Sequence, residues 1–291
     1  MEDQAPDPVP QKLTLWQRLA LREIRKQAGK SGAEPLGEED WAAVMSLHYS
    51  GSGGMVSRLF ARLPSSPRCS MCAAPFAGPG RLVAAPLGCR PSRKNPTLCV
   101  TCVEASPPGG ITVDTGVLFA DLRGFTAHSE GSTPRQVSDL LRRFYKCAES
   151  VFFPEALIDK LIGDEVMALY LPFLRPGIAE DELKRLMFGH AEELLAAVGY
   201  GSARGPFIEV GIGLDFGEAF VGNIGERALY DFTAVGDVVN TAARLQGEAE
   251  GGEIVFSERV AAGLADPKPG EAASLRLKGK AERFRAYRVS R

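Results

Sequence analysis

The chain has 291 residues, of which 45% are hydrophobic and 24% charged, and this composition is ordinary for a soluble globular protein with one sizeable domain and a smaller region. Its net charge of −2 gives no support for binding to nucleic acid or to an anionic membrane surface. No apolar run approaches the roughly 20 residues of a membrane span, and the acidic N-terminus lacks signal-peptide features, so we expect a cytoplasmic protein without a transmembrane segment.

The first region, residues 1–66, is expected to be a tail followed by helices. Apolar residues recur at helical spacing in Leu13–Gln27, opposite a basic face, which predicts an amphipathic helix. This helix could dock on the rest of the protein, pair with its copy in a dimer or lie on a membrane surface. Glu38–Leu63 predicts one or two further helices, interrupted by the glycine-rich stretch 51–54.

The second region, residues 67–106, carries two C-x-x-C pairs separated by 26 residues: Cys69, Cys72, Cys99 and Cys102. The segment is rich in Gly, Pro and Arg and cannot bury much apolar surface, so it needs a cross-link of some kind. Four thiolates favour a closed tetrahedral zinc site, and an iron–sulfur cluster or unliganded, redox-active thiols are the alternatives. Cys89 and Cys147 have no partner at ligand spacing, and Cys147 fits a small core residue.

A Pro- and Gly-rich linker precedes the third region, residues 111–291. Ile111–Leu122 predicts a buried strand that ends near a carboxylate, Asp121, where a hard cation could bind. Thr133–Phe152 predicts a helix with an N-cap threonine followed by proline. Ala156–Tyr170 predicts two strands around a Gly-Asp turn.

The remaining elements complete a βαββαββαβ order. Ala179–Val198 predicts an amphipathic helix, and Phe207–Gly225 predicts a hairpin broken at Gly217 and Gly222. A short strand at 231–235, a helix opening at Gly236 and a last hairpin at 274–289 follow. This order predicts an α+β fold with helices on one face of a mainly antiparallel sheet.

Five motifs occur in this region: FADLRGFT (119–126), KLIGD (160–164), GIGLDFGEAFVGNIG (211–225), DFTAVGDVVNTAARL (231–245) and LKGK (277–280). In this order over residues 111–291 they resemble the catalytic domain of class III nucleotidyl cyclases. The resemblance implies the ferredoxin-like α+β fold of that family. It does not cover the first 110 residues, although the paired C-x-x-C segment resembles that of some bacterial soluble members.

The resemblance also implies a reaction in which the ribose 3′ oxygen joins the α-phosphorus and pyrophosphate leaves. Two divalent ions, Mg²⁺ or Mn²⁺, suit this chemistry and need hard oxygen ligands. By resemblance Asp121 and Asp164 bind the ions, assisted by the carbonyl of Leu122. The backbone N–H groups of the turn that follows would hold the phosphates: Gly124, Phe125 and Thr126.

Three further residues match the family's catalytic and phosphate-binding positions. Asn240 and Arg244 lie at i and i+4 on one helix face, and they match the residues that orient the ribose and meet the charge on the α-phosphate. Lys278 matches the lysine that holds the terminal phosphates, and Lys280 is the weaker candidate.

Lys160 and Thr233 match the residues that recognise the base. A lysine donor and a threonine acceptor fit adenine, since N1 is an acceptor and the 6-amino group a donor. In the family, guanylyl cyclases typically carry Glu and Cys at these positions. Asp231 is the alternative base-reading residue, and Thr233 is preferred.

In the family the two metal-binding aspartates and the base-reading, Asn and Arg residues come from different subunits. The sequence therefore predicts a homodimeric adenylyl cyclase that binds ATP and is regulated by its N-terminal region. The alternatives are a guanylyl cyclase, or a nucleotide- and zinc-binding signalling module with little turnover. The cysteine segment is either a structural cross-link or a redox- or metal-responsive regulator.

Overall fold

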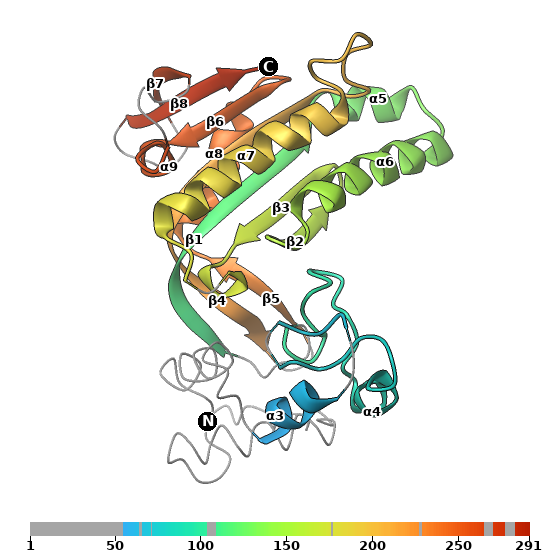
Figure 1. The fold of residues 1–291 in the computed structure, drawn as a ribbon. Helices are drawn as coiled ribbons and strands as arrows, with labels where there is room; N and C mark the ends of the chain where they lie inside the picture. The colour runs from blue at the N-terminus through green and yellow to red at the C-terminus, as the bar shows by residue number, and fades with distance from the viewer. Residues whose placement is uncertain are drawn as a thin grey trace, which may run out of the picture. The chain divides into compact units, whose positions relative to one another are not determined.

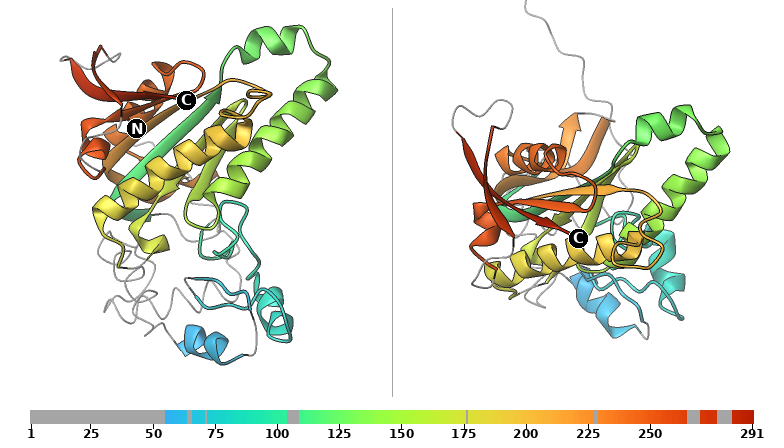
Figure 2. Two further views of the ribbon diagram at one scale, coloured as in Figure 1. Left: turned by 45° about the horizontal axis from the view of Figure 1, so that its top comes forward. Right: turned by 90° about the horizontal axis from the view of Figure 1, so that it is seen from above.

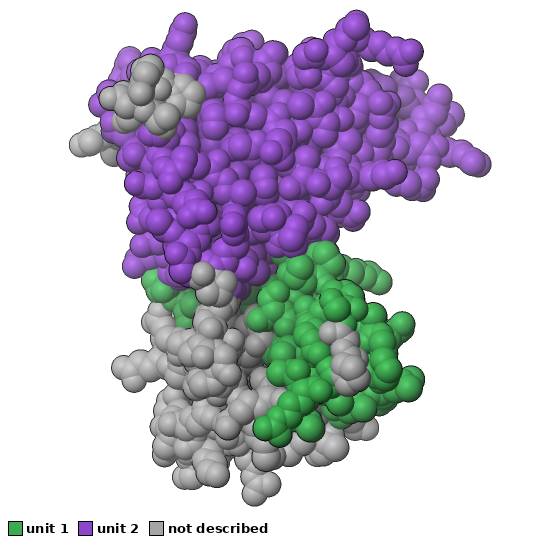
Figure 3. All heavy atoms as spheres, in the orientation of Figure 1, with its two compact units in different colours: residues 1–112, 221–233 green, residues 113–220, 234–291 purple. Residues whose placement is uncertain are grey.

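The computed structural model describes residues 55–63, 66–70, 72–103, 109–175, 177–226, 229–264, 270–276 and 283–291 (Figure 1). The predicted helix Leu13–Gln27 and most of the helical stretch Glu38–Leu63 lie outside these residues. The chain divides into two compact units, residues 1–112 with 221–233 and residues 113–220 with 234–291 (Figure 3).

The described part of the first unit before residue 104 has short helices only: α3 (Met55–Arg62), α4 (Arg81–Ala84) and the 3₁₀ turn η1 (Ala85–Leu87). Arg68 ties α3 to the first C-x-x-C pair. Its guanidinium donates hydrogen bonds to the backbone carbonyls of Phe60, Leu63 and Ala73. Buried cysteines and a few apolar side chains, such as Phe60 and Leu98, form its interior.

One mixed sheet contains all the strands of the described residues, in the order β2-β3-β1-β4-β6-β8-β7 with β5 paired to β4. The strands are β1 (Gly109–Leu122), β2 (Leu157–Ile162), β3 (Glu165–Tyr170), β4 (Val210–Glu226), β5 (Leu229–Val235), β6 (Glu253–Ser257), β7 (Glu271–Leu275) and β8 (Phe284–Ser290). β3 runs antiparallel to β1 and β2, and β8 runs antiparallel to β6 and β7. β4 and β6 are parallel.

The helices of the second unit are α5 (Phe125–Glu130), α6 (Pro134–Phe152), η2 (Pro172–Leu174), α7 (Glu180–Val198), α8 (Asp237–Gly247) and α9 (Glu258–Ala261). The predicted start of α6 is confirmed. Thr133 is its N-cap and forms a capping box with Gln136, and Pro134 is the first helical residue. This arrangement satisfies free N–H groups of the first turn.

The helices of the second unit cover both faces of the sheet, so the prediction that they lie on one face is wrong (Figure 2). Ile254 and Phe256 of β6 belong to the main core, which includes residues of α6 and α7. Val255, between them, belongs to a second cluster with Leu245 of α8. Because successive strand residues point to opposite faces, α8 packs on the face opposite α6 and α7.

The predicted break at Gly217 and Gly222 is also wrong, because β4 is one continuous strand. A Cβ added at Gly222 would lie 2.1 Å from the carbonyl oxygen of Gly109 and 2.4 Å from Cα of Gly110. This glycine therefore permits a close approach between the backbones of β1 and β4 rather than a turn.

The last predicted hairpin is confirmed as β7 and β8. The strand β6 and the helix α9 were not predicted from the sequence.

None of the helices in the described ranges combines the length and the hydropathy that a bilayer span requires.

Candidate active site and cysteine cluster

Two predicted metal-binding residues, Asp121 and Asp164, lie close together: one near the end of β1 and the other in the turn before the neighbouring strand β3. Asp121 is near the end of β1, where it is the register partner of Glu165 in β3. Asp164 occupies the turn between β2 and β3, and its backbone carbonyl accepts a hydrogen bond from N–H of Leu122 at 3.3 Å. Pairing of β1 with β3 thus brings three carboxylates to one edge of the sheet.

Burial and neighbouring negative charge disfavour the ionisation of Asp121 and Glu165. Burial, and then the charge of Asp164, raise the pKa of Asp121 to about 6. Burial, followed by the charges of Asp121 and Asp164, also raises the pKa of Glu165. Clustered acidic oxygen donors are suited to a hard divalent cation, so the residues present fit the Mg²⁺ or Mn²⁺ that the sequence predicts.

Arg123 partly offsets this negative charge, and sequence reasoning missed it. Its Nη1 lies 3.3 Å from Oδ2 of Asp121, and its Nη2 donates to the carbonyl of Gln246. A Cβ at Gly211 would lie 2.4 Å from Nε of Arg123, so the glycine in β4 leaves the space that the guanidinium fills. The basic residue within FADLRGFT was the available signal.

Tyr145 of α6 supports the turn that carries Asp164. Its hydroxyl donates a hydrogen bond to the carbonyl of Gly163, which has φ of +63°. Burial and then the charge of Asp164 raise the pKa of Tyr145. Gly163 suits this left-handed conformation because it lacks a Cβ, and the phenol fixes the turn from the helix side.

The predicted phosphate-binding turn continues directly into a helix. Gly124 has φ of +67° and is the N-cap of α5, so Phe125 and Thr126 are its first two residues. The sequence predicted a turn here but not the helix.

Lys160 follows a β-bulge in β2. The pairing with β3 steps from Ile158–Ala168 to Lys160–Met167, so Asp159 is the additional residue. A bulge changes the direction of the side chains that follow it. The carboxylate of Asp159 is fully buried, the Lys160 side chain is 37% exposed, and Nζ lies 4.0 Å from Oδ2 of Asp159.

The other predicted substrate residues lie on separate elements. Thr233 is buried in β5, and Asn240 is exposed while Arg244 is half-buried on α8. Among the described residues, no hydrogen bond or ion pair joins the side chains of Asn240 and Arg244 to Asp121. Lys278 and Lys280 lie outside the described residues.

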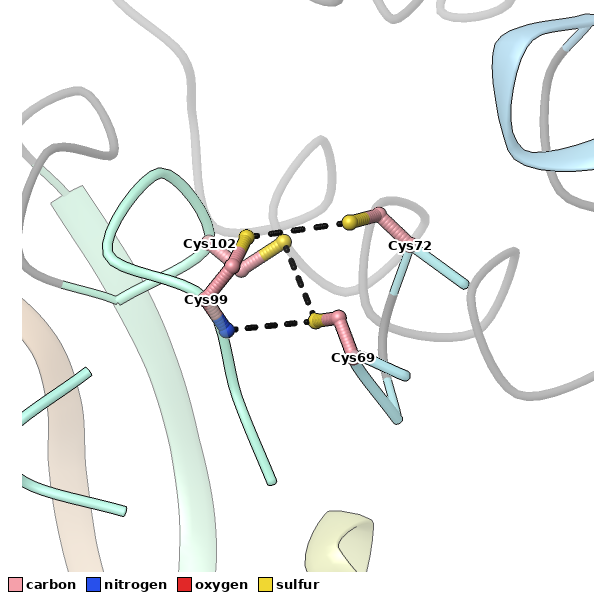
Figure 4. A group of neighbouring side chains, drawn as sticks. All are labelled: Cys69, Cys72, Cys99 and Cys102. Carbon is pink, nitrogen blue, oxygen red and sulfur yellow. Dashed lines mark hydrogen bonds between the residues drawn. The ribbon is translucent and has the colours of Figure 1, made fainter. Parts of the chain in front are cut away.

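The four cysteines of the C-x-x-C pairs converge in the first unit (Figure 4). Their sulfur atoms all lie within 4.8 Å of one another. Sγ of Cys69 and Cys102 are 4.0 Å apart and those of Cys72 and Cys99 are 3.7 Å apart. Tetrahedral Zn–S bonds of about 2.3 Å place sulfurs at about 3.8 Å, so the cluster fits a four-thiolate metal site.

Cys89, which has no partner at ligand spacing in the sequence, adjoins this cluster in the fold. Hydrogen bonds with the thiols of Cys72 and Cys99 lower the pKa of Cys89 to about 4, and its side chain is buried. The spacing of Cys89 along the chain gave no signal of this, because η1 and the loop after it bring the residue to the cluster.

Comparison with known proteins identifies the family. Residues 111–288 match the family described as "Adenylate and Guanylate cyclase catalytic domain". An adenylate cyclase of Anabaena cylindrica is 31% identical over 193 residues, covering 60% of this chain and 36% of the relative. Adenylate cyclase 1 of Rhizobium meliloti (strain 1021) is 30% identical over 132 residues, covering 45% of this chain and 20% of the relative. The chain thus spans only a minor part of these relatives.

Solved structures agree with this match. The adenylyl cyclase CyaB from P. aeruginosa is 25% identical with a TM-score of 0.55, covering 62% of this chain and 95% of that chain. The guanylyl cyclase Cya2 is 27% identical with a TM-score of 0.54, and the match covers 62% of this chain and 93% of Cya2. The family match, the mixed-sheet α+β fold and the paired aspartates agree: this chain belongs to the class III adenylyl and guanylyl cyclases, with a four-cysteine cluster ahead of its catalytic domain.

Proposed function

We propose that the chain is an adenylyl cyclase that converts ATP to 3′,5′-cyclic AMP and pyrophosphate at the interface of a homodimer. The observation that carries the proposal is the convergence of Asp121 and Asp164 within a domain that matches the cyclase family. The cysteine segment, residues 67–106, is a metal-binding module that precedes a catalytic domain of residues 111–291.

The catalytic roles follow from the chemistry of each side chain. Asp121, Asp164 and the Leu122 carbonyl would hold two Mg²⁺ or Mn²⁺ ions. When bound, such ions supply positive charge at the attacking 3′ oxygen and at the leaving phosphates. Asn240 orients the ribose, and Arg244 meets the negative charge that builds up on the α-phosphate.

The phosphates require further donors. Lys278 would hold the terminal phosphates as a point charge. Backbone N–H groups at the start of α5 would hold the others: Gly124, Phe125 and Thr126. Because the donors belong to a turn and a helix start, their directions are fixed before substrate binds.

Adenine specificity rests on Lys160 and Thr233. The ammonium of Lys160 donates to the adenine N1 acceptor, and the hydroxyl of Thr233 accepts from the 6-amino group. Guanine carries an N–H donor at N1, which the donor-only ammonium of Lys160 cannot match, so the lysine would lose its contact with the base. Guanylyl cyclase is the second candidate, because the similar structure Cya2 is named a guanylyl cyclase.

Homodimerisation is proposed because this one chain carries both sets of residues. Asn240 is exposed and Arg244 half-buried on α8, so both are available to a nucleotide held by the aspartates of a second copy.

The four-cysteine module is proposed to bind structural Zn²⁺, which suits closed tetrahedral thiolate sites. An iron–sulfur cluster is the alternative.

The proposal is tested by measuring cyclic AMP and cyclic GMP formed by the purified chain from ATP or GTP with Mg²⁺ or Mn²⁺. Cyclic AMP should predominate and should disappear in Asp121→Ala. Asp139→Ala is the matched control, because Asp139 is an exposed aspartate of α6 that pairs only with Arg142 among the described residues. Predominant cyclic GMP would overturn the adenine assignment, and ATP binding without product would favour a signalling module with little turnover.

A further inference from the structure

The cysteine module contacts the β4–β5 pair through Lys94, within the first unit. Nζ of Lys94 lies 3.0 Å from Oδ1 of Asp231 and donates a hydrogen bond of 2.7 Å to the backbone carbonyl of Phe232. The Lys94 side chain is 12% exposed, so the ammonium is largely withdrawn from solvent. Both of its partners immediately precede Thr233 in β5.

A second contact reaches the neighbouring strand, β4. Nδ2 of Asn223 donates a 3.0 Å hydrogen bond to the carbonyl of Val103, and Asn223 is only 1% exposed. Val103 directly follows Cys102, and Lys94 lies five residues before Cys99. The residues on either side of the second C-x-x-C pair therefore hold both strands of the β4–β5 pair.

The loop that carries Lys94 is fixed to the cysteine cluster by its backbone. N–H of Ser70, in the first C-x-x-C pair, donates to the carbonyl of Thr97 at 2.8 Å, and N–H of Leu98 donates to the carbonyl of Asn95 at 3.0 Å. N–H of Cys99 donates to Sγ of Cys69 at 3.3 Å. A change in the geometry of the four sulfurs would consequently move the loop and its lysine.

We propose that Lys94 is a positioning residue for nucleotide recognition, which couples the metal-bound state of the cysteine cluster to the base-reading strand. The inference rests on the proposed role of Thr233. Lys94 fixes the carbonyl just before Thr233 and the carboxylate two residues before it, so it sets the position from which the threonine hydroxyl reaches the base. Hydrogen bonds that involve an ionised group are stronger and more directional than neutral ones, which suits this role.

The test compares Lys94→Met with Arg90→Met, an exposed cation on the same loop. Lys94→Met should weaken ATP binding and raise the KM for ATP about fivefold, and should lower the preference for ATP over GTP by a similar factor. Its kcat at saturating ATP, its bound metal and its melting temperature should change little. Arg90→Met should match the unaltered protein, and Lys94→Arg should restore most of the preference.

The second arm removes the metal from the cysteines with a mercurial reagent while Mg²⁺ is kept in excess. Metal release should weaken ATP binding to the unaltered protein and should have a much smaller effect on Lys94→Met, because coupling through Lys94 is already lost and only the contact of Asn223 with Val103 remains. An unchanged nucleotide preference in Lys94→Met, or an equal response of both proteins to metal release, would overturn the proposal.

Equilibrium binding of ATP and GTP, measured by calorimetry, separates this inference from the proposed activity. A chain that binds ATP but forms no cyclic AMP contradicts the proposed function, and its Lys94 variants still report on positioning. A chain that forms cyclic AMP with an unaltered preference in Lys94→Met contradicts only the inference. Failure of the unaltered protein to bind either nucleotide would overturn both.

Discussion

Asp121 is held in a partly buried position beside two other carboxylates, and the energetic cost of this position depends on pH. Its pKa is raised from 3.8 to about 6, chiefly by burial and then by Asp164. A raised folded-state pKa stabilises the protein below about pH 4, and this contribution is lost as the pH rises through about 6.

Asp121→Asn should therefore raise the melting temperature at pH 8 in the absence of divalent ions, because the amide cannot ionise. The difference from the unaltered protein should disappear near pH 4, where Asp121 is protonated. Thermal unfolding across this pH range, with Asp139→Asn as the control, measures the effect. A variant that is less stable than the unaltered protein at pH 8 would contradict this reasoning.

Tyr145 is expected to position Asp164 through the turn rather than through contact with substrate. Tyr145→Phe removes the hydroxyl that donates to the carbonyl of Gly163 but keeps the ring. We expect kcat to fall about tenfold, with a higher requirement for Mg²⁺, because small displacements of a metal-binding carboxylate are costly to catalysis.

The matched control for Tyr145 is Tyr200→Phe. It removes a hydroxyl that accepts a hydrogen bond from N–H of Val210, away from the turn. Both variants should lose similar, small amounts of stability in thermal unfolding. If Tyr200→Phe lowered kcat as much as Tyr145→Phe, a specific role for the turn would be excluded.

At the scale of elements, the cysteine module should depend on its metal more than any other part of the described chain. Cys99→Ser removes one of four converging sulfurs, so it should abolish stoichiometric zinc in elemental analysis. Because residues 72–103 contain few regular hydrogen bonds of helices or strands, they should then become sensitive to limited proteolysis.

Cys89→Ser tests whether Cys89 is a metal ligand in addition to the four clustered cysteines. Cys89 touches Cys72 and Cys99 but is not one of the four mutually close sulfurs. This variant should keep about one zinc per chain and remain resistant to protease. Loss of zinc in Cys89→Ser would show that Cys89 is a ligand and that the four-cysteine assignment is wrong.

Some elements could be predicted from the sequence because their signals are local. The boundaries of α6 follow from Thr133, Pro134 and the apolar period, and the β2–β3 turn follows from Gly163 before Asp164. Gly222 was misread, because a glycine that permits close approach of two strands has the same local appearance as a turn glycine. β6 was missed since it is five residues long and buried on both faces, without alternation.

In the candidate site, too, residues within short motifs could be predicted from the sequence, whereas contacts between residues far apart in the chain could not. Asp121 and Asp164 could be proposed as metal-binding residues from motifs, because each lies in a short stretch of residues typical of the family. Lys94 could not, because its partner Phe232 lies 138 positions away. Pairing over such a separation depends on the fold and leaves no periodic pattern in the sequence.

At the scale of the whole molecule, the proposed homodimer places the aspartates of one subunit opposite Asn240 and Arg244 of the other. A single chain that carries both sets would form two equivalent sites in a head-to-tail pair. Asp121→Ala and Arg244→Ala should each be inactive alone, since every site of either homodimer lacks one essential group.

A mixture of the two variants should recover activity. In a heterodimer one site combines both substitutions, whereas the other combines an intact Asp121 with an intact Arg244. Random exchange makes half of the dimers heterodimers, so about a quarter of the unaltered activity should return. A mixture of Asp121→Ala with Asp164→Ala should stay inactive, because both substitutions remove metal-binding aspartates and every site of the heterodimer then lacks one of them. Co-purified heterodimers without recovered activity, or full activity in a monomer, would contradict a shared site.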